Sequence, residues 1–355
     1  MRRIQEFAVK SSALVGLYGA GLVGRSIGQA FAQPFVFVDD TPEKQGTCID
    51  GHDVVSLEQF ASTPASRHQL YICIYQPRFS WERKREQILQ QYPSLNVNSF
   101  ADLFVSSSID TAYAFFEPAD VLKQKLERYT QIAPLLEDAL SRQTLDAHLQ
   151  FRLTGQFEKI VWTSRRDVPF LVAALQPDVT YVDAGAFDGD TAEDFLALSG
   201  GRFSRIQIVE PDVTNLARAR ARMTRLGILD RVEFHAQAIM DTRGMIGFNE
   251  RGREGSSVDP MSEHKVEAVM LSDFDAPGQL YVKLDIEGAE TAALRASRDF
   301  IAARRPLLAI SVYHRPDDLM DIAEGFVDAG YALYLRCHGE AGGDDLMLYA
   351  LPRSA

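Results

Sequence analysis

Short apolar runs alternate with helical stretches in the first part of the chain. The runs are Ala13–Tyr18, Phe35–Val38 and Leu70–Tyr75. A glycine-rich turn and an amphipathic stretch to Phe31 follow the first run, and a charged helical stretch, Trp81–Gln91, follows the third. Strands that alternate with helices are typical of a parallel sheet with crossover helices. The pattern therefore predicts an open α/β domain over residues 1–107.

The next stretch, residues 108–164, contains no convincing strand. Its apolar residues fall at helical spacings, at Leu122, Leu126, Ile132, Leu135, Leu136 and Leu140. Pro134 interrupts or restarts a helix there, because proline has no backbone N–H to donate. The pattern predicts two or three helices that connect the first domain to a second one.

The last part of the chain, residues 165–355, repeats the alternation on a larger scale. Helical segments lie between most of its expected strands, which are Thr180–Asp183, Ile206–Val209, Val232–Ala236, Leu280–Leu284, Leu307–Val312, Tyr331–Leu335 and Leu346–Leu351. This pattern predicts a second open sheet. The fold class expected for the whole chain is therefore α/β, with two Rossmann-like open-sheet domains joined by a helical segment.

Charge and cysteine content restrict the partners and the location. The chain has 37 basic and 49 acidic residues, a net charge of −12. Nucleic-acid binding and polybasic membrane contact both need a basic face, so neither is expected. The cysteines, Cys48, Cys73 and Cys337, follow no disulfide or zinc pattern, which favours a reducing, cytoplasmic location. Glycines interrupt the first apolar run, and no run approaches the roughly 20 residues that a membrane helix needs.

The segment from Tyr181 to Thr191 carries the first chemical signal. A strand ends there, small residues let a ligand approach the backbone, and a helix follows. Ligands of open α/β sheets bind beyond the carboxyl ends of the strands. The acidic side chains of this loop would repel a pyrophosphate and attract the sulfonium and ammonium groups of S-adenosylmethionine. The donor-binding residues predicted here are Asp183, Gly185, Ala186, Asp188, Gly189 and Thr191.

The next two strand ends supply the remaining predicted donor contacts. Glu210, followed by Pro211, closes the second strand, where a carboxylate can accept hydrogen bonds from both ribose hydroxyls. A turn-capping carboxylate is the alternative interpretation of Glu210. The third strand end should flank the adenine, and Gln237 and Ala238 are the candidates for that contact.

A third acidic segment follows the fourth strand. Asp285 stands at the carboxyl end of this strand, next to the expected place of the methyl group, and Glu287 and Glu290 follow it around Gly288. Complementation of a helix macrodipole is the alternative explanation of these charges, and it suits the two glutamates better than Asp285.

At this point the sequence resembles the FkbM methyltransferase family, over about residues 130 to 355. The resemblance rests on Asp183-x-Gly185-Ala-x-x-Gly189, Ile208-Val-Glu210-Pro211, Lys283-Leu-Asp285-Ile-Glu287-Gly288-Ala-Glu290 and the stretch Pro306 to His314. It departs from the family at Phe187, where the family often has Asn. The resemblance implies a class I methyltransferase fold and methyl transfer from S-adenosylmethionine to oxygen on sugars, polyketides or related small molecules.

Methyl transfer from a sulfonium is an in-line displacement that positioning, electrostatics and a general base can accelerate. Asp285 and His314 close strands that should line the acceptor side. Asp285 is the candidate for orienting donor or acceptor, and His314 is the candidate base, with a structural role as its alternative. Asp285, Glu287 and Glu290 carry oxygen ligands for a cation, but no second carboxylate pair is evident, so no metal is expected. Gly255-Ser256-Ser257 lies in an insert expected to form a hairpin or lid.

The first domain carries a second candidate nucleotide site. Gly19, Gly21 and Gly24 follow a strand and open a helix, and Asp39 ends the next strand, which is the dinucleotide fingerprint in its usual setting. This part also resembles the N-terminal domain of PglD-type sugar acyltransferases, through Gly19-Ala-Gly21-x-x-Gly24-Arg25 and Val38-Asp39-Asp40. That resemblance implies a pocket for a nucleotide-linked sugar. A purely structural or dimerising domain, within a homo-oligomer, is the alternative.

Three hypotheses for the whole protein remain open. The first is a methyltransferase acting on a hydroxyl of a sugar or glycan precursor. The second is a bifunctional enzyme whose N-terminal domain binds NAD. The third is a non-catalytic nucleotide-binding protein that has kept the methyltransferase fold, against which the intact Asp183, Gly185, Glu210 and Asp285 argue.

Overall fold

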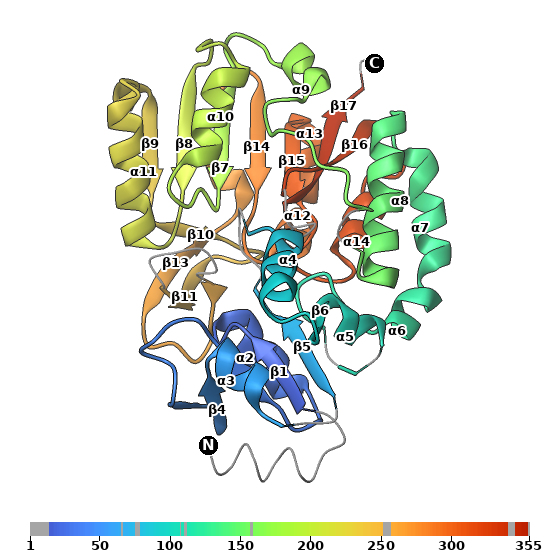
Figure 1. The fold of residues 1–355 in the computed structure, drawn as a ribbon. Coiled ribbons are helices and arrows are strands. Elements are labelled where there is room, and N and C mark those ends of the chain that lie inside the picture. The colour runs from blue at the N-terminus through green and yellow to red at the C-terminus, as the bar shows by residue number, and fades with distance from the viewer. Residues whose placement is uncertain are drawn as a thin grey trace. The chain divides into compact units, whose positions relative to one another are not determined.

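The computed structural model describes residues 14–64, 67–74, 79–106, 108–109, 112–156, 159–250, 257–339 and 345–353 (Figure 1). The chain divides into two compact units. The first comprises Met1–Glu127, Asp146–Val161 and Gly339–Asp344, and the second comprises Arg128–Leu145, Trp162–His338 and Asp345–Ala355. The helical stretch predicted as a connector, 108–164, is therefore shared between the two units.

The first unit contains a mainly parallel sheet in the order β3-β4-β2-β1-β5-β6. Its strands are β1 (Leu14–Tyr18), β2 (Val36–Val38), β3 (Cys48–Ile49), β4 (His52–Val55), β5 (His68–Ile72) and β6 (Asn96–Ser99). Its helices are α2 (Leu22–Ala30), α3 (Leu57–Ser62), α4 (Trp81–Gln91), α5 (Ala101–Val105) and α6 (Ala119–Gln124). Among these strands only β3 runs antiparallel to its neighbour.

The expected strands of this unit are present as β1, β2 and β5, while Ala13 of the first prediction and Tyr75 of the third lie outside the described residues. The pattern missed β3, β4 and β6. All three are short and mix polar with apolar residues, and at most half of the side chains in each are buried. Such strands carry little of the apolar signal that marks a buried parallel strand.

The second unit contains a larger sheet in the order β16-β17-β15-β14-β7-β8-β9. Its strands are β7 (Thr180–Ala184), β8 (Arg205–Val209), β9 (Val232–His235), β14 (Leu280–Leu284), β15 (Leu307–Ser311), β16 (Tyr331–Cys337) and β17 (Leu346–Pro352). The strands from β15 to β9 are parallel, and β17 runs antiparallel to both of its neighbours. The predicted Rossmann-like sheet is thus confirmed.

The strand order places a switch point at β7. From β7 the chain moves to β8 and β9 on one side, and it later returns to β14 and β15 on the other side. The connections diverge there, and open sheets of this kind bind ligands beyond the carboxyl ends of the strands at such a point.

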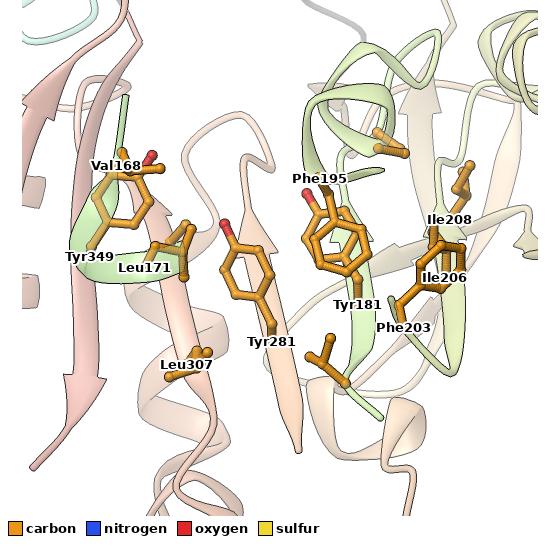
Figure 2. Close-up of a cluster of buried hydrophobic side chains, with 14 of the residues drawn as sticks. Val168, Leu171, Tyr181, Phe195, Phe203, Ile206, Ile208, Tyr281, Leu307 and Tyr349 are labelled. Atoms are coloured by element: carbon orange, nitrogen blue, oxygen red, sulfur yellow. The ribbon is translucent and has the colours of Figure 1, made fainter. Parts of the chain in front are cut away.

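Helices and an aromatic core support this sheet. The helices are α9 (Pro169–Ala174), α10 (Asp190–Leu198), α11 (Val213–Arg225), α12 (Glu290–Ala296), α13 (Arg298–Arg304) and α14 (Asp318–Glu324), with 3-10 turns at Ala133–Leu135, Leu229–Arg231 and Leu271–Phe274. Tyr181 of β7 stacks on Phe195 of α10, with ring centroids 4.4 Å apart, and on Tyr281 of β14, 4.9 Å apart (Figure 2). This packing fixes α10 over β7 and thereby fixes the loop that joins them.

Helices α7 (Leu126–Ile132) and α8 (Ala139–Thr154) each contribute residues to both units. Within the second unit, the residues before α8 add to the edge of the sheet, where Leu136 forms a bridge with Leu333 of β16. Among the described residues, no helix combines the length and apolar character that crossing a membrane requires.

The segment between β9 and β14 forms a small sheet of its own. It contains β10 (Gln237–Ile239), β11 (Gly244–Asn249), β12 (Ser257–Val258) and β13 (Lys265–Val269) in the order β10-β13-β11-β12. β11 and β13 pair antiparallel, as the expected hairpin requires. Gly255 and Ser256 lie outside the described residues. The strand predicted over Val232–Ala236 ends at His235, because the chain leaves the large sheet at Ala236.

Candidate active site

The loop between β7 and α10 turns on two glycines in left-handed conformations, Gly185 (φ 71°) and Gly189 (φ 81°). A Cβ at Gly185 would lie 1.7 Å from the main-chain oxygen of Asp285, so no side chain fits there. Phe187 also has a positive φ of 47°, a conformation that Asn adopts more readily than bulky residues do. The loop thus brings the end of β7 directly against the end of β14.

Three of the predicted loop residues support the loop from inside. Asp183 is fully buried, and its Oδ2 accepts a hydrogen bond from Oγ1 of Thr191 (2.7 Å). Burial raises the pKa of Asp183, although the Lys283 ammonium opposes this shift. Ala186 is also fully buried, in the core beneath the loop. These side chains fix the shape of the loop.

Glu210 connects the first two strand ends. It directly follows β8, it is only 6% exposed, and its two oxygens accept hydrogen bonds from the backbone N–H of Phe187 and of Asp212 (3.0 Å each). Burial raises the pKa of Glu210 to about 7, against the lowering effect of these hydrogen bonds. Pro211 follows it, and Asp212 then caps α11. The carboxylate predicted to bind ribose therefore also holds the glycine loop.

Asp188 has a partner that the sequence pattern did not indicate. Its carboxylate accepts a hydrogen bond from Nη2 of Arg222 (2.5 Å), and the same guanidinium donates to the main-chain oxygen of Asp188 and to Glu193 of α10. Arg222 lies on α11, so this contact joins two helices across the loop. No local motif marks such a partner, because the contact depends on how the helices pack.

The predicted adenine contacts lie in the small sheet. Gln237 and Ala238 belong to β10, where Ala238 packs into the core of that sheet. The side-chain amide of Gln237 donates a hydrogen bond to Glu267 of β13 (2.7 Å). Contact between these residues and an adenine ring remains a prediction.

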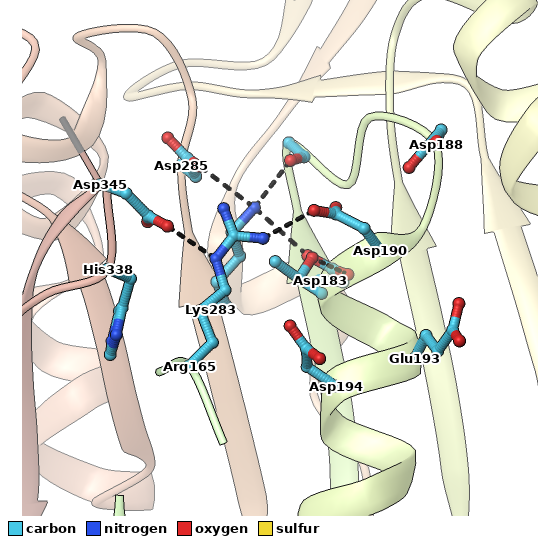
Figure 3. A network of polar contacts seen from close by, with 12 residues as sticks. Arg165, Asp183, Asp188, Asp190, Glu193, Asp194, Lys283, Asp285, His338 and Asp345 are labelled. Atoms are coloured by element: carbon cyan, nitrogen blue, oxygen red, sulfur yellow. Dashed lines mark hydrogen bonds and ion pairs between the residues drawn. The ribbon is translucent and has the colours of Figure 1, made fainter. Parts of the chain in front are cut away.

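Lys283 lies at the centre of the polar network on the sheet (Figure 3). Its side chain is 6% exposed, and its ammonium donates to the main-chain oxygen of Gly185 (2.8 Å). The same nitrogen lies 3.4 Å from Oδ1 of Asp183 and 3.4 Å from Oδ2 of Asp285. Burial alone would lower the pKa of Lys283, but the two carboxylates outweigh it and raise the pKa. Lys283 is therefore a buried cation between two predicted site residues.

Arg165 forms a second bridge that sequence reasoning missed. Its guanidinium contacts Oδ2 of Asp190, at the start of α10, and Oδ2 of Asp345, just before β17, at 2.6 Å each (Figure 3). A small, open recess has Arg165, Tyr281 and Lys283 in its lining. The segment leading into α9 thus closes one side of the loop. Asp345 is 180 residues from Arg165 in the chain, too far for a local signal.

The two predicted catalytic residues do come together. Oδ1 of Asp285 lies 3.5 Å from Nε2 of His314 and accepts a hydrogen bond from the Tyr313 hydroxyl (3.1 Å). Nδ1 of His314 lies 3.0 Å from Oε1 of Glu290, which is fully buried at the start of α12. Glu287, at 3.8 Å from Nε2 of His314, is more exposed. The sequence alternative for Glu290, a charge complementing the helix dipole, does not account for its burial.

The charges of Asp285 and His314 follow from the groups around them. Burial alone would lower the pKa of His314, but the carboxylates of Glu290 and Asp285 outweigh burial and raise it to about 10. Burial alone would raise the pKa of Asp285, but Lys283 and His314 lower it to about 2. Near neutral pH the ring is therefore an imidazolium, which donates hydrogen bonds. The base role predicted for His314 applies only to its neutral form.

The glycine fingerprint of the first unit is folded as predicted. Gly19 has φ 106°, Gly21 precedes α2, and a Cβ at Gly24 would lie 1.9 Å from the main-chain oxygen of Gly19. Asp39 is 6% exposed, and it accepts hydrogen bonds from the backbone N–H of Ala20 and Thr41 and from the Lys44 ammonium, at 2.8–2.9 Å. The acid expected to bind ribose thus already has protein partners on both oxygens.

Comparison with known families gives a match within the second unit. Residues 183–333 match the family described as the Methyltransferase FkbM domain. This range begins at Asp183 and includes Glu210, Asp285 and His314. A sequence comparison with curated proteins gives no match.

Comparison with solved structures gives one likeness over nearly the whole chain and a weaker one over about half of it. An FkbM methyltransferase from Methylobacillus flagellatus KT, 22% identical, covers 99% of this chain and 93% of its own, with a TM-score of 0.74. A precorrin-6y C5,15-methyltransferase from Geobacter metallireducens GS-15, 16% identical, covers 55% of this chain and 95% of its own, with a TM-score of only 0.33. Together with the strand order, the first likeness shows a class I methyltransferase fold. Residues 183–333 are thus similar to the Methyltransferase FkbM domain, within a chain that has the fold of a methyltransferase.

Proposed function

We propose that the second unit transfers a methyl group from S-adenosylmethionine to a hydroxyl of a sugar, a glycan precursor or a related small molecule. The observation that carries this proposal is Glu210. A buried carboxylate at the end of β8, hydrogen-bonded to the backbone of the glycine loop, has free lone pairs for two ribose hydroxyls. A phosphate at this point would meet two buried carboxyl groups, Asp183 and Glu210, and would be repelled.

The methyl-accepting side lies at the ends of β14 and β15. Asp285, whose side chain is 21% exposed, can accept a hydrogen bond from an acceptor hydroxyl and orient it for in-line attack. The protonated ring of His314 lies 3.5 Å away, and Lys283 and His314 together keep this carboxylate ionised. The rate enhancement would then come mainly from positioning and from fixed charges, as displacement at a sulfonium allows.

Calorimetric titration of the purified full-length protein with S-adenosylhomocysteine tests the donor site. We expect micromolar binding that falls about 10–100-fold in Glu210→Ala, since each hydrogen bond to a charged group is worth about 1.5–3 kcal/mol. Glu233→Ala is the matched control, because Glu233 lies on the neighbouring strand and pairs with Arg205 at the surface. If well-folded protein does not bind S-adenosylhomocysteine, the proposed function is wrong.

For the first unit we propose a nucleotide or nucleotide-sugar site at Gly19, Gly21 and Gly24. Asp39 already accepts three hydrogen bonds, so it has little capacity left for the ribose of any nucleotide, and the glycine turn before α2 would have to supply the phosphate contacts. Titration with NAD and with UDP-sugars decides between a nucleotide and a nucleotide-sugar. Binding of NAD alone would favour the bifunctional alternative, and binding of neither would favour a structural or dimerising unit.

A further inference from the structure

Arg165 has one guanidinium nitrogen that the described part of the chain leaves without a partner. Its Nε donates a hydrogen bond to Oδ2 of Asp345 and its Nη1 donates to Oδ2 of Asp190, at 2.6 Å each, and Nη2 has no hydrogen-bond partner among the described residues. In Figure 3 the guanidinium lies between these two carboxylates, and its remaining nitrogen points toward the side on which Asp285 lies. The two short ion pairs hold the group in one orientation, so its unused N–H donors face a fixed direction.

Two other cations at the glycine loop are already occupied. The Lys283 ammonium faces three oxygens, one from the main chain and two from carboxylates. Arg222 donates hydrogen bonds from all three of its guanidinium nitrogens, to a main-chain oxygen and to two carboxylates. Of these three cations, Arg165 therefore has the capacity to bind an anionic group of a ligand without giving up a partner.

The position of Arg165 along the sheet matches one end of the proposed methyl donor. Glu210, at the end of β8, would hold the ribose, and Asp285, at the end of β14, would stand beside the methyl group, with β7 between the two strands. The sulfur joins the ribose, the methyl group and the amino-acid part, so the amino-acid part leaves it on the side away from Glu210. Arg165 spans that side, because Asp190 begins α10 and Asp345 precedes β17, which starts beside the carboxyl end of β15.

A carboxylate at this edge of the sheet needs a cation with a free donor. Asp183 and the other acidic residues of the edge would repel it. Burial would raise the pKa of Asp285, and Lys283, His314 and, to a smaller extent, Arg165 lower it to about 2, so the charge of Arg165 acts at the end of β14. Guanidinium groups bind carboxylates through strong, charge-assisted hydrogen bonds.

We propose that Nη2 of Arg165 binds the α-carboxylate in the amino-acid part of the methyl donor. This assignment rests on the proposed methyltransferase function. It gives Arg165 a contact with the ligand in addition to its bridge between Asp190 and Asp345, and it requires an arginine, because a lysine has one nitrogen and cannot serve three partners in one plane. The contact would make the site prefer a donor that carries the carboxylate over one that lacks it.

Calorimetry on the full-length protein with S-adenosylhomocysteine and with its decarboxylated analogue tests this contact. The analogue keeps the adenosine, the sulfur and the amine, so the two ligands differ only in the carboxylate. Wild type should bind S-adenosylhomocysteine at least about tenfold more tightly than the analogue, as expected for a hydrogen bond between charged groups. Arg165→Met should abolish this preference. Arg166→Met is the matched control and should keep it, because Arg166 is 53% exposed and pairs with Asp194.

The ratio of the two affinities separates a contact with the ligand from a loss of structure, because a disturbed loop weakens both ligands alike. If Arg165→Met keeps the wild-type ratio, or if wild type has no preference, Arg165 only supports the loop, and the methyltransferase assignment stands without this contact. If neither ligand binds folded wild type, the proposed function itself is wrong. Arg165→Gln, which can still donate a hydrogen bond to Asp190, decides whenever Arg165→Met does not fold.

Discussion

Lys283 donates a hydrogen bond from β14 to the main-chain oxygen of Gly185, across the strand pair on which the donor loop is built. The same ammonium lies 3.4 Å from Asp183 and from Asp285. One buried cation thus holds the glycine loop and balances the charges of two site residues. The lysine of the Lys-x-Asp-x-Glu-Gly segment is a structural centre of the candidate site.

Replacement of Lys283 by methionine should destabilise the second unit strongly. The change leaves Asp183 buried without its counter-charge, and breaking a buried ion pair costs about 3–5 kcal/mol. Urea unfolding followed by circular dichroism measures the loss. Lys265→Met, an exposed lysine on β13, should change the free energy of unfolding by less than about 0.5 kcal/mol. Equal stabilities for the two variants would contradict the central role of Lys283.

A methyl group at Gly185 should abolish donor binding. The Cβ of Gly185→Ala would lie 1.7 Å from the main-chain oxygen of Asp285, so the ends of β7 and β14 would have to separate. Gly227→Ala is the matched control, since Gly227 has a similar φ of 72° but no atom within 4 Å of its Cβ position. The control should lose only about 1–2 kcal/mol of stability from its left-handed backbone. S-adenosylhomocysteine affinity comparable to wild type in Gly185→Ala would contradict this geometry.

Affinity for S-adenosylhomocysteine should depend on the ionisation of Glu210. Burial raises the pKa of Glu210 to about 7. Ionising Glu210 in the folded protein therefore costs free energy, and the stability of the fold falls as the pH rises from the ordinary glutamate range to about 7. The ribose hydroxyls bind the ionised form. Affinity should therefore be constant above pH 8 and fall about tenfold between pH 8 and pH 6, as expected for one titrating group. The affinity of Glu210→Gln for S-adenosylhomocysteine should not change with pH in this range. If it still does, another group causes the pH dependence.

Replacement of Arg165 should destabilise the protein more than replacement of its neighbour Arg166. Arg165 bridges Asp190 and Asp345, whereas Arg166 pairs with Asp194 and is more exposed. Arg165→Met should lower the free energy of unfolding by about 1.5–3 kcal/mol, the range for charge-assisted hydrogen bonds, and weaken donor binding because Asp190 begins α10. Arg166→Met should cost less than about 1 kcal/mol. If Arg166→Met loses more stability than Arg165→Met in thermal or urea unfolding, the bridge from Arg165 to Asp190 and Asp345 does not stabilise the fold.

The sequence by itself determined the strand-and-loop framework of both sheets and the residues at the strand ends. Asp183, Glu210 and Asp285 could be predicted as neighbours because the carboxyl ends of parallel strands meet at one edge of a sheet. The left-handed backbone of the loop after β7 favours glycine at Gly185 and Gly189, so the glycines in the sequence already mark this loop. The short strands β4, β6 and β10 escaped prediction because partial burial leaves little periodic signal.

Only the tertiary structure decided which side chains meet across that edge and in what state of charge. Arg165 reaches Asp345, Arg222 reaches Asp188, and Glu290 turns inward to His314. These pairs are set by how helices and strands from distant parts of the chain pack, and no spacing in the sequence encodes that packing. The protonated state of His314 follows from the same cause, because its pKa depends on the carboxylates that the fold gathers around it.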